Sequence, residues 1–109
     1  MTSSFSIEEE PECRELFHNN GNLYARTCLV NDVLHNTKGP SSELWDKKGR
    51  IVYREFCVNG VPHNVSGPAF EWWKRGSLVR REFWVNGKKM SEEEFLALHP
   101  KSTVKDVKW

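Results

Sequence analysis

A chain of 109 residues is long enough for one domain and too short for two full hydrophobic cores. Its 16 basic and 15 acidic residues nearly cancel, so the whole chain exerts no strong long-range attraction on nucleic acid or on a membrane surface. Six Phe, two Tyr and five Trp exclude a wholly disordered chain. No apolar run approaches the roughly 20 residues of a membrane-spanning helix. We expect a protein that is intracellular, cytoplasmic and not secreted.

The chain divides by composition into three parts. Residues 1–16 contain five glutamates and one arginine, with no apolar stretch of the kind found in signal peptides, and are expected to be a flexible acidic segment. Residues 17–90 carry the strand-forming sequence, and residues 91–109 are expected to form a capping helix and a tail.

The three cysteines, Cys13, Cys28 and Cys57, are an odd number without C-x-x-C spacing. Such a set predicts neither a disulfide framework nor a zinc site, and it favours a reducing compartment.

Strand candidates follow one another at 23–30, 41–45, 50–58, 69–73 and 78–85, each rich in β-branched and aromatic residues. Between them stand Asn-Gly pairs, which adopt the positive φ angles of type I′ hairpin turns, and Asn31-Asp32 takes the same place in an earlier turn. The pattern predicts a mainly β fold, an antiparallel meander. Both faces of the sheet would carry apolar side chains, so it must curl, be covered or pair with another chain.

A repeat of 27 or 28 residues underlies this order. The segment VNGVPHNVSGPAFEWW at 58–73 repeats VNDVLHNTKGPSSELW at 30–45, and FHNNGNLYAR at 17–26 belongs to an earlier partial copy. The chain therefore holds about two and a half units, each of which needs a neighbour to bury its faces. A structural role in the repeat is expected for His35, Gly39, Pro40, Trp45, Asn59, Gly60, His63, Gly67, Pro68, Trp73, Asn86 and Gly87.

The motif His-Asn-x-x-Gly-Pro occurs at 35–40 and 63–68. We expect a bent crossover in which glycine takes an unusual φ, proline fixes the exit direction and histidine hydrogen-bonds to backbone groups. After the last strand, Ser91 and Glu94 form a capping-box sequence and predict a short helix from 91 to 98.

These residues resemble the MORN-like repeats that are common in phages and large DNA viruses: an Asn-Gly turn, a histidine, Gly-Pro, then an acidic and an aromatic residue. The resemblance covers residues 17–98 and includes the terminal element VNGKKMSEEEF at 85–95. It implies a β-repeat fold and a viral or phage type of protein. Asn36 and Asn64 replace the usual arginine of that family, and Lys38 and Ser66 its aspartate, so a salt bridge of the repeat is expected to be absent.

The sequence offers no catalytic motif, no cofactor-binding loop and no cluster of metal ligands, and we expect neither an enzyme nor a metal or cofactor site. The function expected is binding of a protein partner of unknown identity, or of a second copy of the chain. Aromatic and arginine side chains dominate such interfaces. Tyr53, Trp72, Arg80 and Trp84 are the candidate interaction surface.

The alternative is nucleic-acid binding through residues 72–89. There six lysines and arginines interleave with aromatic residues, a mixture that supplies phosphate contacts and stacking platforms. The balanced net charge argues against this alternative.

Overall fold

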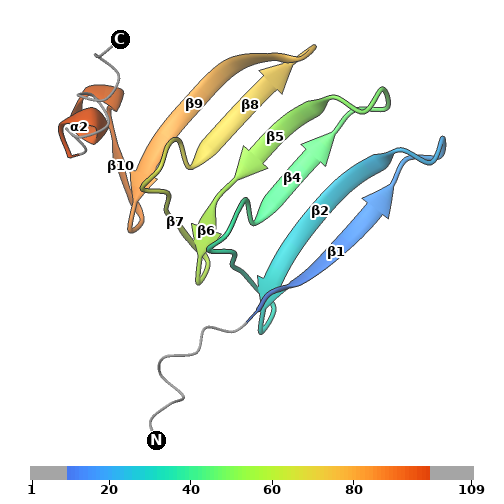
Figure 1. Ribbon diagram of the computed structural model, residues 1–109, viewed down its shortest axis with the longest axis horizontal. Helices are drawn as coiled ribbons and strands as arrows, with labels where there is room; N and C mark the ends of the chain where they lie inside the picture. The colour runs from blue at the N-terminus through green and yellow to red at the C-terminus, as the bar shows by residue number, and fades with distance from the viewer. Residues whose placement is uncertain (1–9, 99–109) are drawn as a thin grey trace, which may run out of the picture.

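The computed structural model describes residues 10–98, which form a single layer of antiparallel β-structure with a short helix at its C-terminal end (Figure 1). This confirms the predicted antiparallel meander and C-terminal helix. The elements are β1 (Glu12–Phe17), β2 (Leu23–Val30), β3 (Val33–Leu34), β4 (Ser42–Trp45), β5 (Ile51–Glu55), β6 (Cys57–Val58), β7 (Val61–Pro62), β8 (Phe70–Lys74), β9 (Ser77–Val85), β10 (Lys88–Met90) and α2 (Glu92–Ala97).

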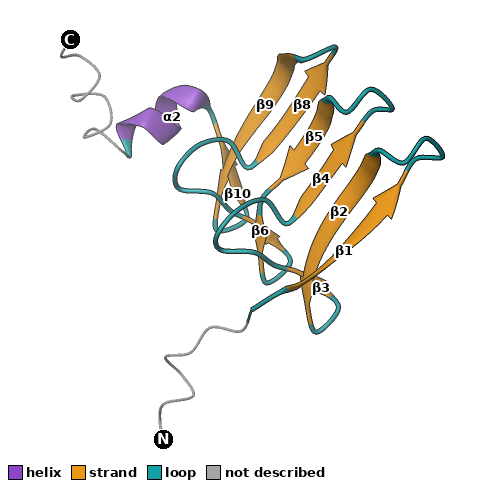
Figure 2. Ribbon diagram, turned by 45° about the vertical axis from the view of Figure 1, so that its right-hand side comes forward, coloured by secondary structure: helices purple, strands orange, loops and turns teal. Residues whose placement is uncertain are grey.

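Three long hairpins, β1–β2, β4–β5 and β8–β9, lie side by side in the main sheet, whose order is β1-β2-β4-β5-β8-β9-β10. Three short hairpins, β2–β3, β6–β7 and β9–β10, lie at the opposite end of the layer from the long hairpins' turns (Figure 1). Figure 2 shows the sheet turned by 45° from this view, with α2 beyond its β9–β10 end. The sheet starts at Glu12, before the boundary expected at residue 17, and residues 1–9 and 99–109 lie outside the described part.

The Asn-Gly turns have the backbone that the sequence predicts. Asn59 and Gly60 have φ angles of 52° and 79°, and Asn86 and Gly87 have nearly the same values. Gly60 is also required by space, because a Cβ there would stand 2.9 Å from Cγ1 of Val33. Its N–H donates to the Leu34 carbonyl, so this turn packs directly on the preceding short hairpin.

Each crossover histidine holds the turn of the following period. The Asn59 N–H donates to Nδ1 of His35 at 2.9 Å, and the Asn86 N–H donates to Nδ1 of His63 at 2.8 Å. An Nδ1 that accepts a hydrogen bond carries no proton, so both rings are in the Nε2-protonated tautomer. We call these two contacts the histidine junctions. The expectation that histidine bonds backbone groups is confirmed, and the group it bonds belongs to the next turn.

The crossovers themselves are shaped by asparagine. The Asn36 side chain donates to the Pro40 carbonyl and accepts from the Lys38 N–H, and Asn64 makes the same pair of bonds to Pro68 and Ser66. In each crossover the asparagine side chain thus holds the bend through these two hydrogen bonds. The expectation of an unusual φ at Gly39 and Gly67 is wrong in the sense that neither residue has a positive φ.

One face of the sheet carries a row of alternating charges that runs across the strands. Its members are Glu15, Arg26, Glu43, Arg54, Glu71, Arg81 and Glu92, one from each main-sheet strand from β1 to β9 and the last from α2; we call it the charge row. Ion pairs of 2.7 to 3.9 Å join Glu15 through Glu71 in sequence and join Arg81 to Glu92, and Glu71 and Arg81 stand opposite each other in register. Opposite charges directly across a strand pair stabilise that pairing.

Few side chains are fully buried, as expected for a single layer. The buried apolar residues of the described chain are Ala25, Cys28, Cys57, Ala69, Phe83 and Phe95, accompanied by the polar residues His35 and Ser41. Helix α2 joins this thin core at its end, where the Phe95 and Phe83 rings are 4.7 Å apart. Ser91 caps the helix and forms the predicted capping box with Glu94.

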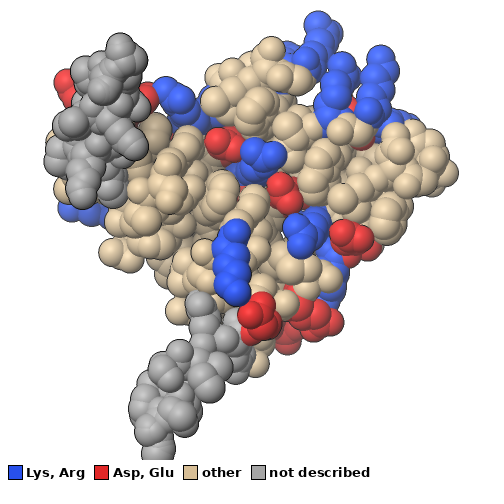
Figure 3. All heavy atoms as spheres, in the orientation of Figure 1, with Lys and Arg blue, Asp and Glu red and all other residues tan. Residues whose placement is uncertain are grey.

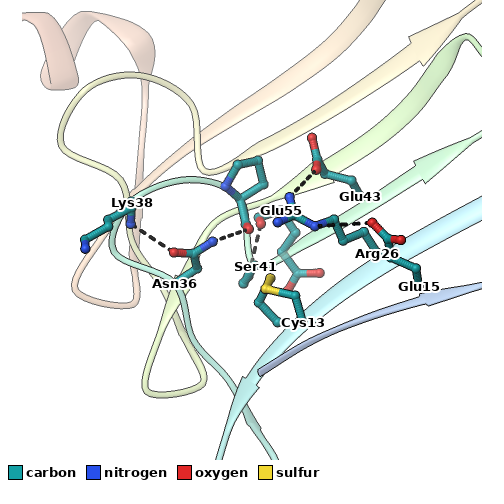
Figure 4. The surroundings of a disulfide bond; sticks show 10 residues. Cys13, Glu15, Arg26, Asn36, Lys38, Ser41, Glu43 and Glu55 are labelled. Carbon is teal, nitrogen blue, oxygen red and sulfur yellow. Dashed lines mark hydrogen bonds and ion pairs between the residues drawn. A yellow bond between two sulfur atoms is a disulfide. The ribbon is translucent and has the colours of Figure 1, made fainter. Parts of the chain in front are cut away.

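Cys13 and Cys28 stand directly opposite each other on β1 and β2 and form a disulfide bond (Figure 4). The expectation that the cysteines form no disulfide is therefore wrong, and the argument for a reducing compartment loses its basis. Cys13 precedes Ser41 by 28 positions, as Ser41 precedes Ala69 (41 − 13 = 69 − 41). Ser41 and Ala69 each directly follow a crossover that begins with a histidine. In the first period Ile7 stands at the sequence position equivalent to His35, and the disulfide fastens β1 to β2.

Replacing His35 by Phe is expected to lower the free energy of unfolding by about 1–3 kcal/mol, because the ring is kept while the Asn59 N–H loses its acceptor. The same change at His63 should cost less, because its junction is more exposed to water. Urea denaturation measures both values, with the exposed Thr37→Ala as the control. Stability equal to wild type in both histidine variants would contradict the role given to the junctions.

Candidate interaction surface

The face of the sheet opposite the charge row carries a cluster of aromatic rings, which we call the aromatic face: Tyr53 on β5, Phe70 and Trp72 on β8, and Trp84 on β9. Tyr53 and Trp72 stand opposite each other in register, with ring centroids 5.8 Å apart. Phe70 stacks on Trp72 at 5.8 Å and meets Trp84 edge-on at 5.9 Å. Such pairs add to the stability of the face beyond the area they bury.

Two glutamates fix the polar edges of these rings. Glu55 accepts the Tyr53 hydroxyl at 2.8 Å, and Glu82 accepts the Trp84 indole N–H at 3.0 Å. Glu82 also accepts from Arg80 at 2.6 Å, and the Arg80 guanidinium lies 5.0 Å from the centre of the Trp72 ring. The rings are thus oriented before any partner arrives, which reduces the entropy lost on binding.

The titration of this face reflects the same contacts. The indole N–H of Trp84, followed by the Arg80 guanidinium, lowers the pKa of Glu82. Burial and the hydrogen bond to Glu55 raise the pKa of the Tyr53 hydroxyl. At neutral pH Glu82 is therefore ionised and Tyr53 protonated, as their hydrogen bonds require.

The four residues predicted as an interaction surface, Tyr53, Trp72, Arg80 and Trp84, are brought together on this one face. Each of the three rings is partly exposed. Trp73 lies on the opposite face, where the Arg54 guanidinium is 5.8 Å from its ring centre. Trp73 is also only partly buried, so burial does not separate Trp73, expected to be structural, from Trp84, expected on the interaction surface.

Sequence reasoning missed Phe70, which links Trp72 to Trp84, and the two glutamates that hold the ring edges. A signal was present, because Glu55 and Glu82 are 27 positions apart and each is flanked two residues away by side chains that donate to it. Residues i and i+2 of a strand share a face, so the pattern could have been found.

Basic side chains gather at the tips of two neighbouring long hairpins. Lys47 and Lys48 belong to the β4–β5 turn, Lys74 ends β8 and Arg75 lies in the β8–β9 turn; Figure 3 shows blue side chains standing out from the surface at these tips. Within residues 10–98 no carboxylate lies within ion-pair distance of these four. Arg50 differs, because it pairs with Asp46 at 2.9 Å, and the backbone N–H of Arg50 is the main cause of a lowered pKa at Asp46.

A hollow of about 670 Å³ separates the two crossovers, between residues 36–39 and 63–68. Phe56 and Val58 form its apolar part, and Lys38 and Glu71 its charged part. The amides of Asn36 and Asn64 face it but are used within their own crossovers. The hollow is therefore the space that the two bent crossovers leave between them.

The described residues contain no group of three or more His, Cys, Asp or Glu placed to hold a metal ion. Over the same residues, no helix has the length and apolar character needed to cross a membrane. The chain matches no family model, and comparison with curated proteins and with solved structures gives no significant match.

Cys57, the remaining free cysteine, is expected to resist alkylation in the folded protein. Burial, followed by a hydrogen bond to Glu55, raises the pKa of its thiol from 9.0 to about 12. The reactive thiolate is therefore scarce near neutral pH. Between pH 9 and about 12 the unfolded chain releases this proton more readily than the folded chain, so the contribution of Cys57 to stability is complete below pH 9 and falls as the pH rises to about 12.

Mass spectrometry after iodoacetamide treatment, with the disulfide intact, measures this reactivity. Labelling should be slow in the folded chain and fast in guanidinium chloride. Equal rates in the two conditions would contradict the environment assigned to the thiol.

Proposed function

We propose that the chain is a non-enzymatic, MORN-like β-repeat module of viral or phage type that binds a protein partner, or a second copy, through its aromatic face. The observation that carries the proposal is the cluster of Tyr53, Phe70, Trp72 and Trp84, held in place by Glu55 and Glu82 and left partly exposed on a single-layer sheet. Tryptophan, tyrosine and arginine are the side chains that contribute most to protein interfaces. A face of oriented aromatic rings therefore suits binding better than catalysis.

The recurrence of the histidine junctions and of the charge row at 27- and 28-residue intervals supports the repeat part of the proposal. Units of a repeat protein contact their neighbours through equivalent positions. The viral or phage type rests on the sequence resemblance alone.

Trp72→Ala and Trp84→Ala are expected to abolish binding through the aromatic face, and Trp73→Ala, on the other face, to preserve it. Binding to a second copy is read from the molar mass by light scattering at two concentrations. Binding to a different partner is read from capture on the immobilised chain. Trp73→Ala should instead lower the melting temperature, because its ring packs against Arg54. Loss of binding to the same degree in all three variants, or no binding in either assay, would contradict the proposal.

The basic hairpin tips, which have no ion-pair partner among residues 10–98, favour nucleic-acid binding as the second candidate function. Lys74 and Arg75 follow Trp72 and Trp73 along the β8–β9 hairpin, so phosphate contacts and ring stacking could serve one strand. On this alternative, a fluorescent single-stranded DNA should gain anisotropy at low salt and lose it as salt is added. The change should weaken in Lys74→Gln with Arg75→Gln. A flat titration at low salt would remove the candidate.

A further inference from the structure

Strand β1 is one edge of the main sheet, and at the other end β10 pairs with β9 only along Phe83–Val85, so within residues 10–98 no strand pairs with the outer side of Ser77–Glu82. All six residues of β1 are exposed, and so are the first five of β9. Leu16 and Phe17 on β1 are 60% and 58% exposed, and Val79 on β9 is 60% exposed. An exposed strand edge is a ready template for pairing with another strand.

The two internal junctions of the sheet show how one period joins the next. Where β2 meets β4, the Cys28 N–H donates to the Ser41 carbonyl at 2.8 Å and Arg26 pairs with Glu43 at 3.8 Å. Where β5 meets β8, the Phe56 N–H donates to the Ala69 carbonyl at 2.8 Å and Arg54 pairs with Glu71 at 3.6 Å. Besides the ladder of the paired strands, both junctions therefore share an equivalent backbone hydrogen bond and an equivalent arginine–glutamate pair.

The two ends of the sheet carry the two separated halves of such a junction. On β9, Arg81 and Phe83 occupy the positions of Arg54 and Phe56, because both lie 27 residues further on (81 − 54 = 83 − 56), but Phe83 already pairs with Met90 of β10. On β1, Cys13 and Glu15 occupy the positions of Ser41 and Glu43, 28 residues earlier (41 − 13 = 43 − 15).

If β9 of one copy met β1 of another in the same register, Arg81 would face Glu15. The next pair would bring Glu82 against Arg14, as Thr27 stands against Ser42 inside the chain. Both contacts join opposite charges. The register found between β2 and β4 and between β5 and β8 would therefore also place opposite charges together between β9 of one copy and β1 of another.

Helix α2 occupies the β9 half of this junction. Glu92 accepts from Arg81 at 2.7 Å through both carboxylate oxygens, as Glu43 and Glu71 pair with the preceding arginines. Phe95 covers Phe83. The helix therefore supplies the carboxylate and the apolar cover that a following strand would bring.

We propose that β1 is a docking strand for the outer edge of β9 of a second copy, and that α2 controls this head-to-tail association by covering the edge. The contact is heterologous, joining two different edges, so it leaves a free edge at each end and does not close at a dimer. It uses the edges of the sheet and needs no binding at the aromatic face.

The test uses the full chain with Glu92→Gln and Phe95→Ala, which remove the two contacts of α2 with β9; we call this variant the loosened chain. Its molar mass is measured by light scattering over a wide concentration range. The mass should rise above that of wild type and keep rising with concentration. Glu92→Gln alone, which keeps the apolar contact of the helix, should give a smaller rise and is informative even if the double variant loses its fold. Glu93→Gln, a charge removed from the same helix turn without contact to Arg81, should behave as wild type.

Adding Glu15→Arg to the loosened chain should return the mass to the wild-type value, whereas Glu12→Arg, the same charge change on the same strand, should not. Adding Arg81→Glu to the Glu15→Arg chain should restore the rise, since the pair is then re-formed with exchanged charges. A loosened chain that keeps the wild-type mass, stops at a dimer, or associates to the same degree with and without Glu15→Arg would overturn the proposal.

Discussion

The charge row joins the strands of this protein by placing opposite charges on neighbouring strands next to each other. Within it, Glu43 and Glu71 stand between arginines on both neighbouring strands, and their side chains are only 12% and 15% exposed. A carboxylate buried to this degree needs a cation beside it, because desolvation is costly for an unpaired charge. The row therefore acts as a constraint on register: shifting any strand by one residue would move its charged side chain to the aromatic face.

The same constraint explains how a sheet with so little buried surface holds its shape. Among residues 10–98 the fully buried side chains are few and mostly small. The contacts that recur between periods therefore contribute much of the stability of the sheet. At the N-terminal end, where the first period has no crossover histidine, a disulfide holds β1. At the C-terminal end, Glu92 of α2 pairs with Arg81, the last arginine of the charge row, and Phe95 packs against the buried ring of Phe83. The two faces are then free for different roles, one charged and structural, the other aromatic.

Local features of the fold could be read from the sequence because they depend on short-range chemistry. The Asn59-Gly60 and Asn86-Gly87 turns and the Ser91–Glu94 capping box are examples. The Cys13–Cys28 disulfide and strand β1 could not, because they depend on which residues stand opposite each other across two strands. Tyr53, Trp72, Arg80 and Trp84 were found as a set because they are large and lie at or near positions that vary between periods. Phe70, which connects them, was missed because only the register of β8 reveals its neighbours.

The free energy of unfolding of Arg54→Met tests the account most directly, measured against Arg50→Met as the matched control. Both changes remove one arginine from an ion pair of about the same length, 3.2 Å to Glu43 and 2.9 Å to Asp46. Arg54 serves two largely buried carboxylates, so its loss should cost about 2 kcal/mol or more. The loss of Arg50, paired with a more exposed aspartate in a turn, should cost less than about 1 kcal/mol. Equal costs in the two variants would contradict the claim that the charge row holds the strands together.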